Sequence, residues 1–529
     1  MSVMEFPDRL NAAAVFIDDN IAAGRGDKPA ILCGDETVTY TQLHENVNRV
    51  GNALLDLGIR IEQRVAILMP DNPDCVYAFF GVIKVGGIAI PMNTILMPKD
   101  YEYLLNDSRA HVLVVHPSLL GHVMEIRGRL KHLEHIIVAG EDHDAPLVLD
   151  KLMAAASPQL EPVETSKDDA AFWLYSSGTT GFPKGAIHLH HDMIVEADLY
   201  ARDTIGLVES DTSFSIAKLF FAYGLGNGLY FPLRTGGTTV LLPERPMPKT
   251  VYEVIDRYQP TVYYGVPTSY AAMLHLAEQT DRTSLGNIRM CISAGEPLPK
   301  PIYDKWLERF GVEILDGIGS TEILHIFISN RPGRVKPGST GEIVEGYEAK
   351  IIGDDGKQVP VGAEGTLYIM GDSIANGYWN KHEQTKTTFC GEWINTHDKF
   401  SIDEDGFFWY AGRTDDMMKV SGQAVWPAEV EAILIDHPAV LESGVIGVPD
   451  AEGLLKPRAY VVLKDGHDPT DELIRELQTF VKKNTAPHKY PRSIVFVEFL
   501  PKTATGKIQR YRLRQMAAEE MQEEETQDS

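Results

Sequence analysis

Cysteines are few in this sequence of 529 residues, and the four that are present lie far apart. None of them forms the CxxC spacing of a metal or redox site, and their scatter does not suggest a disulfide framework. Such cysteines are typical of a protein of the reducing cytoplasm. We expect no signal peptide, because Glu5 and Asp8 stand where that segment needs basic residues and then an apolar run. The expected location is therefore cytoplasmic.

Long apolar runs and basic side chains are scarce as well. The longest apolar stretch, residues 76–90, is interrupted by Lys84 and is shorter than the roughly 20 residues that span a bilayer, so no membrane association is expected. Lysine and arginine number 49 against 75 acidic residues, which gives a formal net charge of −26. This balance argues against nucleic-acid binding, which depends on basic side chains neutralising phosphates. It does not exclude a small anionic ligand, since a few local N–H groups and cations suffice to bind one.

Short aliphatic segments alternate with helical stretches through much of the chain. Strand candidates lie at residues 64–69, 88–91, 112–115 and 135–138, and a helix candidate lies at 75–85. This alternation predicts parallel sheets covered on both faces. After about Val344, segments such as 365–370 and 406–411, separated by turns rich in Asp and Gly, predict antiparallel hairpins. The length predicts two to four domains.

The strongest local signal is the segment Tyr175–Gly185 (YSSGTTGFPKG), which follows an apolar strand candidate. Its glycines allow the backbone to approach an anion closely, its hydroxyl groups add donors, and Lys184 adds a mobile cation. These features are typical of a loop that binds polyphosphate. It is not a Walker A loop, because Gly185 follows Lys184 where that motif has serine or threonine. The alternative, a flexible linker of small residues, does not need a lysine at this position.

Five further motifs follow this loop along the chain. They are Ser293–Pro297 (SAGEP), Asp316–Glu322 (DGIGSTE), Thr396–Asp398 (THD), Gly412–Gly422 (GRTDDMMKVSG) and Pro501–Lys507 (PKTATGK). With these six motifs the chain resembles, over nearly its whole length, the adenylate-forming superfamily of acyl- and aryl-CoA ligases, firefly-type luciferases and peptide-synthetase adenylation domains. His397 stands where that family usually has glycine.

The resemblance implies ATP, Mg²⁺ and coenzyme A as ligands. Lys184 and the loop hydroxyls would hold the β- and γ-phosphates, Thr321 the α-phosphate, and Glu322 the magnesium ion. Lys507 would contact both the substrate carboxylate and the α-phosphate, and Asp398 the ribose. The full set implied for ATP or AMP is Ser176, Ser177, Gly178, Thr179, Thr180, Gly181, Lys184, Ala294, Gly295, Glu296, Pro297, Asp316, Gly317, Ile318, Gly319, Thr321, Asp398 and Arg413.

The resemblance also implies a fold with a large domain and a smaller, mobile lid. The expected class is α/β plus α+β, with doubly wound parallel sheets and a small antiparallel barrel-like piece in a large domain, residues 1–412. A smaller α+β lid would occupy residues 413–518, and an acidic tail residues 519–529. The lid would turn about Asp415 after the first half-reaction, replacing Lys507 by the loop that carries Lys419 and Gly422, so that coenzyme A reaches the acyl group.

The acid is indicated by two stretches, residues 218–227 and 319–327, which resemble those of benzoate-CoA ligases. By that resemblance a short, flat, largely apolar slot would hold an aromatic ring. Its residues would be Phe221, Ala222, Tyr223, Ala294, Gly319, His325 and Ile326, with Phe221 on the coenzyme A side. Because either Tyr223 or His325 could hydrogen-bond a ring hydroxyl, 4-hydroxybenzoate and related aryl acids stay open beside benzoate.

Other functions use parts of the same signature. Only 22 residues follow Lys507, which leaves no room in this sequence for a fused carrier domain, although a separate carrier protein stays open. A luciferase-like oxygenase uses the same adenylation step. A phosphotransferase or a silent nucleotide-binding protein represents a different class, distinguished by whether AMP, ADP or neither is produced. The sequence leaves a homodimer open.

Overall fold

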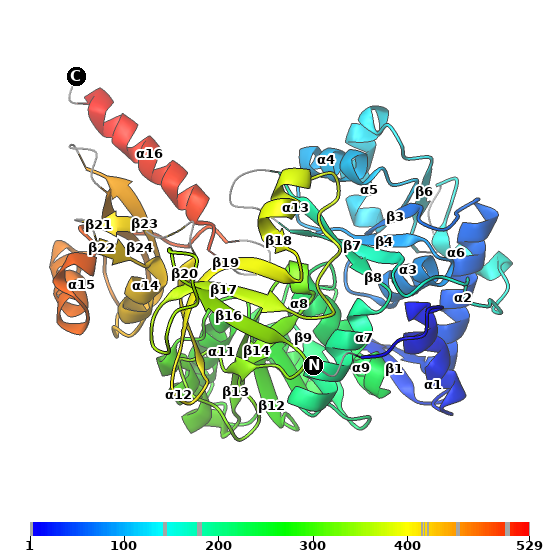
Figure 1. Cartoon of the computed structure of the whole chain (residues 1–529), viewed down its shortest axis with the longest axis horizontal. Coiled ribbons are helices and arrows are strands. Elements are labelled where there is room, and N and C mark those ends of the chain that lie inside the picture. Colours follow the sequence, from blue (N-terminus) through cyan, green and yellow to red (C-terminus); the bar gives the residue numbers. More distant parts are fainter. Residues whose placement is uncertain are drawn as a thin grey trace.

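The computed structural model describes residues 4–140, 145–176, 182–413, 416, 418–420, 423–450, 455–502 and 508–527. These residues form a large body and a smaller one that lies at the left of Figure 1 and carries the C-terminal helix. Within the described residues, no helix is long and apolar enough to cross a membrane.

The first sheet of the large body has six strands in the order β6-β5-β3-β4-β7-β8, all parallel except β8. Its strands are β3 (Arg64–Leu68), β4 (Ile88–Pro91), β5 (Val112–Val115), β6 (His135–Val138), β7 (Ala170–Ser176) and β8 (Lys184–Leu189). Around it lie η1 (Ala14–Asp18), α1 (Asp19–Ala22), α2 (Tyr40–Asp56), α3 (Pro73–Lys84), α4 (Pro98–Ser108), α5 (Pro117–Ile126), η2 (Arg127–Arg129) and α6 (Leu149–Ala155).

Alternate residues of β3 show why helices cover both faces of this sheet. Val65 and Ile67 belong to the hydrophobic cluster that contains α2 and α3, whereas Ala66 and Leu68 belong to the cluster of α4 and α5. A strand whose successive side chains are all apolar must be buried on both faces. The parallel sheet predicted from these segments is therefore confirmed.

The second sheet has nine strands in the order β15-β14-β13-β12-β11-β9-β10-β1-β2, with a parallel centre and antiparallel edges. Its strands are β1 (Pro29–Cys33), β2 (Glu36–Thr39), β9 (Thr212–Ser215), β10 (Thr238–Val240), β11 (Val262–Gly265), β12 (Met290–Ser293), β13 (Ile314–Gly319), β14 (Ile326–Ser329) and β15 (Glu342–Ile343). The helical segments are α7 (Asp192–Glu196), η3 (Ala197–Thr204), α8 (Ala222–Leu225), η4 (Gly226–Tyr230), α9 (Phe231–Thr235), α10 (Pro248–Tyr258), α11 (Pro267–Gln279), α12 (Lys300–Phe310) and η5 (Thr321–Ile323).

A curled antiparallel sheet of five strands completes the large body and confirms the antiparallel piece expected after Val344. It consists of β16 (Glu348–Ile352), β17 (Gly365–Met370), β18 (Phe389–Cys390), β19 (Trp393–Ile402) and β20 (Phe408–Arg413), with α13 (His382–Thr388) before β18. In Figure 1 this sheet lies between the large parallel sheets and the smaller body.

The smaller body is an α+β layer built on a three-stranded sheet. Its elements are β21 (Met418–Val420), β22 (Gln423–Val425), α14 (Pro427–Ile435), β23 (Val440–Pro449), β24 (Leu455–Leu463), α15 (Asp471–Asn484), η6 (Pro487–Lys489), β25 (Ser493–Phe496) and α16 (Arg510–Gln527). Val461 faces the cluster of α14 and α15, and Tyr460 faces Leu513 of α16. The acidic end of the chain continues α16, and Glu520 there pairs with Arg458 at 2.9 Å.

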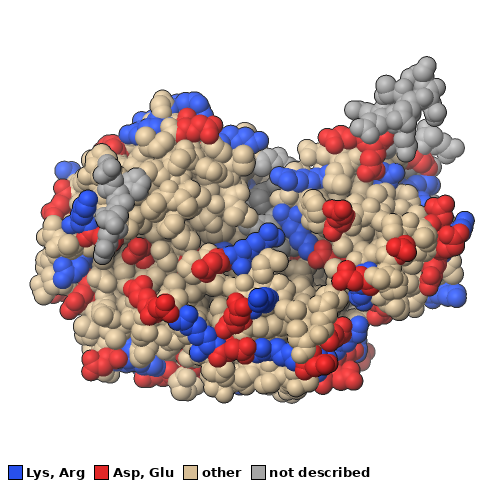
Figure 2. Space-filling view, turned by 180° about the vertical axis from the view of Figure 1, so that it is seen from behind, with Lys and Arg blue, Asp and Glu red and all other residues tan. Residues whose placement is uncertain are grey.

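Charged side chains of both signs are interspersed over the face shown in Figure 2. Several lysine and arginine side chains gather in the hollow between the large body and the smaller one. Local cations of this kind can hold an anionic ligand in a protein whose net charge is strongly negative.

Candidate active site

Three distant segments meet at the carboxylate of Glu322. Its Oε1 accepts hydrogen bonds from the Tyr378 hydroxyl at 2.7 Å and from Ser176 Oγ at 3.3 Å. Lys184 lies opposite Ser176 in the β7–β8 pair, and its Nζ is 4.4 Å from the centre of the Tyr378 ring. Burial raises the pKa of Tyr378, Glu322 adds to that rise, and the nearby Arg413 opposes it. Ser176, Lys184, Glu322 and Arg413, all predicted from sequence, thus surround a tyrosine that no motif indicated.

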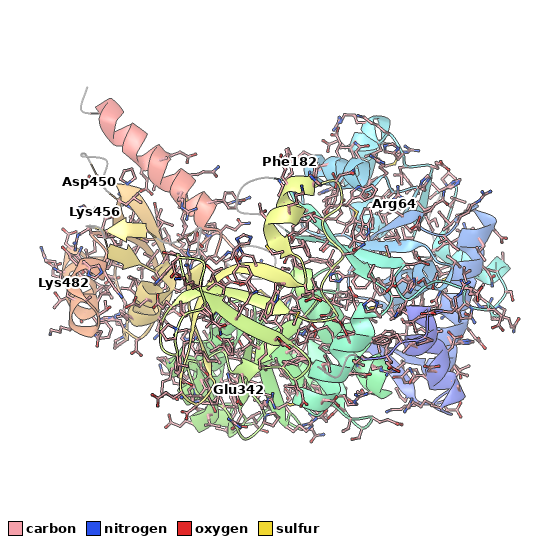
Figure 3. The ribbon with its side chains drawn as sticks, viewed as in Figure 1. Arg64, Phe182, Glu342, Asp450, Lys456 and Lys482 are labelled. Atoms are coloured by element: carbon pink, nitrogen blue, oxygen red, sulfur yellow. The ribbon has the colours of Figure 1, made fainter. Side chains whose placement is uncertain are left out.

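The phosphate loop leaves β7 at Ser176 and returns to the described structure at Phe182. The predicted residues Ser177, Gly178, Thr179, Thr180 and Gly181 lie outside the described residues. Phe182 stacks on Tyr103 of α4 at 4.7 Å, and the Tyr103 hydroxyl donates to the Pro183 carbonyl at 3.0 Å. Figure 3 shows Phe182 beside α13, at the returning end of this loop. The end of the loop that carries Lys184 is therefore packed against α4.

A buried histidine supports the backbone of Thr321. His188 Nε2 donates to the Thr321 carbonyl at 2.8 Å, and His188 Nδ1 lies 2.8 Å from Asp192 Oδ2. Both side chains are fully buried, and burial raises the pKa of Asp192. Because a carbonyl only accepts, Nε2 carries a proton, and Nδ1 shares another with Asp192. The sequence motifs did not indicate this pair.

A second buried network holds the next turn of the same segment. Ser373 Oγ donates to the Ile323 carbonyl at 2.8 Å, and the Tyr347 hydroxyl donates to Glu196 Oε1 at 2.8 Å. Burial raises the pKa of Glu196 to about 8, against the hydrogen bonds that favour its charged form. Glu196 is therefore largely a neutral acid at pH 7, which suits a carboxyl group away from water.

The raised pKa of Glu196 predicts a pH-dependent stability. Between its ordinary pKa of 4.5 and about 8, the folded protein holds a proton that the unfolded chain has lost, so stability falls as pH rises. One such group contributes a slope of about 1.4 kcal/mol per pH unit. Glu196→Gln should remove this slope, so the variant gains stability relative to the wild type between pH 6 and pH 8. Urea unfolding at both pH values measures the difference.

Glu345→Gln, which changes an exposed carboxylate, serves as the matched control and should leave the slope unchanged. Parallel stability profiles for Glu196→Gln and the wild type would contradict the assignment.

The turn at residues 294–297, which is predicted to lie on the adenine side, is fixed to the neighbouring strand. Gly295 has φ +96°, a conformation that favours glycine, and Leu298 N donates to Asp316 Oδ2 at 3.3 Å. Burial raises the pKa of Asp316 to about 8, so this side chain is mostly neutral near pH 7. Asp316 thus holds the turn in place with one of its oxygens.

Two glycines after Asp316 are required by packing within the sheet. A Cβ at Gly317 would lie 2.9 Å from the Ile328 carbonyl oxygen, and one at Gly319 would lie 2.3 Å from that of His325. Both are in β13, where Gly319 pairs with Ile326 of β14. Ile318, between them, is half-buried. Close approach of the two strands therefore explains these glycines without reference to a ligand.

The proposed ribose side is a tight turn in β19. His397 has φ +59°, and its N–H donates to Asn395 Oδ1 at 2.9 Å. This left-handed backbone accounts for the glycine that relatives usually carry there. Asp398 is paired with Arg413 across the β19–β20 ladder, with 3.5 Å between Oδ1 and Nη1. The structure therefore keeps Asp398 and Arg413 side by side despite the histidine.

Two groups of residues predicted for the aryl slot, those around α8 and those at the start of β14, are in contact. Phe221 precedes α8, which begins at Ala222, and His325 Nε2 donates to the Tyr223 carbonyl at 3.1 Å. The Tyr223 hydroxyl donates to backbone carbonyls, 3.1 Å from that of Gly265. Burial lowers the pKa of His325 to about 3, so its ring is neutral. Since Nε2 donates, Nδ1 is an acceptor, and no described residue hydrogen-bonds to it.

The remaining predicted residues belong to the smaller body and the segment before it. Lys419 lies in β21, and nothing is described of its side chain. Asp415, Gly422 and Lys507 lie outside the described residues. The described residues contain no group of three or more histidine, cysteine or acidic side chains that could hold a metal ion. A metal ion at Glu322 would therefore depend on oxygens from its ligand.

Comparison with known proteins shows the family of the chain. The family model for AMP-binding enzymes matches residues 19–379, and the model for their C-terminal domain matches residues 429–507. The chain therefore belongs to the family of AMP-binding enzymes.

Within this family its relatives include ligases of aromatic acids. It is similar to the benzoate–CoA ligase of Thauera aromatica, with 48% identity over 513 residues, 97% of each chain. It is also similar to the solved anthranilate CoA ligase AuaEII in complex with anthranoyl-AMP, with 44% identity, TM-score 0.94 and coverage of 97% and 99%. The benzoate CoA ligase from Burkholderia xenovorans LB400 superposes with TM-score 0.88 at 44% identity, over 95% and 99% of the two chains.

Proposed function

We propose that this enzyme is an acid–thiol ligase that activates benzoate with ATP and transfers the acyl group to coenzyme A. The first half-reaction makes benzoyl-AMP and releases pyrophosphate, and the second makes benzoyl-CoA and releases AMP. The observation that carries the proposal is that Ser176 and Tyr378 donate to Glu322, while Lys184 lies over the Tyr378 ring. Full-length similarity to a benzoate–CoA ligase supports the choice of acid and thiol.

The chemistry explains why such a site is needed. A carboxylate resists attack by a thiol because its leaving group would be oxide, whereas AMP leaves readily. The oxygen of the acid attacks the α-phosphorus, the bond to the bridging oxygen of pyrophosphate breaks, and negative charge spreads over the phosphate oxygens. Lys184, Arg413 and Lys507 would offset this charge. Thr321, held by His188, would direct its hydroxyl and N–H to the α-phosphate.

This arrangement fits a magnesium ion that binds together with the nucleotide. Glu322 would supply one carboxylate, and the nucleotide phosphates and water the other oxygens, in keeping with the usual coordination of Mg²⁺. When bound, the ion would neutralise phosphate charge. Tyr378 and Ser176, which donate to Oε1, hold the Glu322 carboxylate in one orientation.

The aryl slot favours an unsubstituted ring while leaving one alternative. The Tyr223 hydroxyl proton is directed to backbone carbonyls, so Tyr223 does not offer it to a substrate. His325 Nδ1 is a buried acceptor, which would suit a ring carrying a hydroxyl or amino donor. Benzoate is therefore the first choice, and hydroxy- or amino-substituted benzoates are the alternative.

A panel of acids tests this function. Benzoate, its hydroxy, amino and fluoro derivatives, cyclohexane carboxylate and hexanoate are each incubated with ATP and Mg²⁺, with and without coenzyme A. We expect coenzyme A-dependent AMP formation, fastest with benzoate. ADP as the acid-dependent product would instead identify a phosphotransferase, and neither nucleotide would identify a silent binder.

Other features stay predictions that accompany this function. A mobile lid beginning after Gly412 would alternate between the two half-reactions. Cytoplasmic location and a homodimer agree with an enzyme acting on small soluble substrates.

A further inference from the structure

Glu296 connects the nucleotide-side turn of the large body to the C-terminal segment of the smaller one. Its Oε1 accepts a hydrogen bond from the backbone N–H of Ile508 at 3.0 Å, across 212 positions of sequence. Ile508 is the residue directly after Lys507. The carboxylate therefore binds the chain beside the lysine that the first half-reaction is proposed to require.

The Ile508 segment is itself held at a fixed point of the smaller body. Lys502 and Ile508 form an antiparallel bridge, and Gln509 N donates to the Pro501 carbonyl at 2.8 Å. Lys502 Nζ also bonds Glu442 of β23 at 2.6 Å. The chain before residue 503 and after residue 507 is thus anchored to the sheet of the smaller body. A hydrogen bond to Ile508 therefore positions the smaller body as a whole.

Charged groups of the smaller body surround the Glu296 carboxylate. Lys502 and Arg510 attract the carboxylate, although burial as the largest influence raises its pKa. Arg510 is in turn bonded to Glu431 at 2.6 Å. On the other side, the turn that carries Glu296 is fixed by the bond from Leu298 N to Asp316. The Glu296 contact therefore joins two pieces that are each held firmly.

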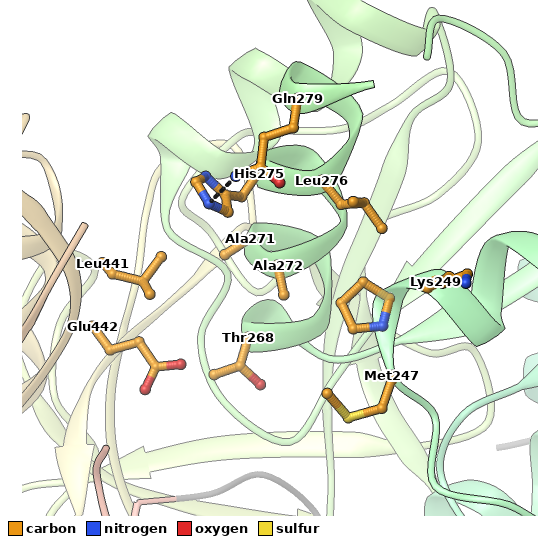
Figure 4. A pocket seen from close by; sticks show the side chains of 11 residues that line it. Met247, Lys249, Thr268, Ala271, Ala272, His275, Leu276, Gln279, Leu441 and Glu442 are labelled. Carbon is orange, nitrogen blue, oxygen red and sulfur yellow. Dashed lines mark hydrogen bonds between the residues drawn. The ribbon is translucent and has the colours of Figure 1, made fainter. Parts of the chain in front are cut away.

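The two bodies are only partly packed against each other near this contact. A hollow of about 330 Å³ separates α11 from β23 and is lined by Thr268, Ala272 and His275 on one side and by Leu441 and Glu442 on the other. Figure 4 shows these side chains facing one another across the gap. Where apolar packing is incomplete, a single hydrogen bond to a carboxylate carries more of the docking energy.

We propose that Glu296 is a positioning residue that docks the chain at Ile508, directly after Lys507, onto the nucleotide-side turn for the first half-reaction. This inference rests on the proposed function and extends it. The contact joins the two bodies, so it must break when the lid turns for thioester formation. Glu296 would then favour adenylation without taking part in the second step. This role differs from the contact with the nucleotide that the sequence motif implies for Glu296.

The two half-reactions, measured separately, test this role. Glu296→Ala should lower kcat for benzoyl-AMP formation by about tenfold or more, the range expected for a lost hydrogen bond to a charged group. KM for ATP and thioester formation from supplied benzoyl-AMP and coenzyme A should stay near wild type. Glu296→Gln keeps an acceptor oxygen and should recover part of the loss. Glu308→Ala, at an exposed carboxylate of α12, is the matched control.

Every other pattern overturns the proposal. A raised KM for ATP would show that Glu296 contacts the nucleotide. An equal loss in both half-reactions would show a structural role, and unchanged rates would show that Glu296 has no role. If the wild-type enzyme made no AMP from any acid, the proposed function would be refuted. The docking role would then be tested by the distances between the two bodies.

Those distances come from spin labels on exposed residues of the two bodies, in a Cys390→Ser background because Cys390 is exposed. Labels at Glu308→Cys in α12 and Lys483→Cys in α15 should give one main distance in the protein without ligands. Glu296→Ala should broaden it or add a second distance, and Glu296→Gln should do so less. An unchanged distribution in Glu296→Ala would overturn the docking role.

Discussion

Replacing Lys507 by alanine is expected to abolish adenylate formation while sparing thioester formation from supplied benzoyl-AMP. The lysine would stabilise negative charge on the α-phosphate only in the first step. Removing a group that stabilises transition-state charge typically lowers the rate about 10²- to 10³-fold. The measurement follows pyrophosphate release from benzoate and ATP, and separately benzoyl-CoA formation from the adenylate.

Two features sharpen this experiment. Lys483→Ala, at an exposed lysine of α15, removes the same charge from the smaller body and should leave both half-reactions unchanged. Comparison with Glu296→Ala separates chemistry from docking, because among the described residues Glu296 accepts its hydrogen bond from the Ile508 backbone, directly after Lys507. Equal loss of both half-reactions in Lys507→Ala would contradict the account with two lid positions.

The strands of the sheets could be predicted because a buried strand is marked by its own short run of apolar residues. Val112–Val115 is short, β-branched and buried throughout, and it forms β5 at the predicted bounds. The helical nature of the C-terminal end was harder to see. In α16, Leu513 and Ala517 pack on the smaller body, but the second half of the helix is rich in glutamate. Apolar residues at 513, 516 and 517 make up only one turn of the helix, too short a stripe to distinguish a docked helix from a solvated tail.

The candidate site shows the same limit at the level of side chains. Motifs placed Ser176, Lys184 and Glu322 at one site because their glycine-rich surroundings are recognisable in sequence. Tyr378 lies outside the six motifs, and its bond to Glu322 depends on how the chain between β17 and α13 folds over β8. The left-handed backbone of His397 also needed the structure, since a histidine rarely adopts it.

The buried histidine behind Thr321 leads to the other large expected effect. His188→Phe keeps the stacking on Phe172, whose ring centre lies 5.1 Å away, but removes the bonds to the Thr321 carbonyl and to Asp192. A bond to a charged group contributes about 1.5–3 kcal/mol, so the free energy of unfolding should fall by that amount. A displaced Thr321 should also lower kcat for adenylation about 10²-fold, the usual result of misplacing a group by 1 Å.

His190→Phe separates the two effects. His190 is equally buried two positions away, and its Nδ1 accepts from Ala12 N at 3.0 Å, on the N-terminal segment. This variant should lose stability too, yet keep kcat near the wild-type value at a temperature where both variants are folded. Chemical denaturation gives the first quantity, and pyrophosphate release under saturating ATP gives the second. If both variants lowered kcat alike, His188 would act only through stability. A selective loss in His188→Phe would show that the buried pair positions Thr321, because the two substitutions differ mainly in which backbone they release.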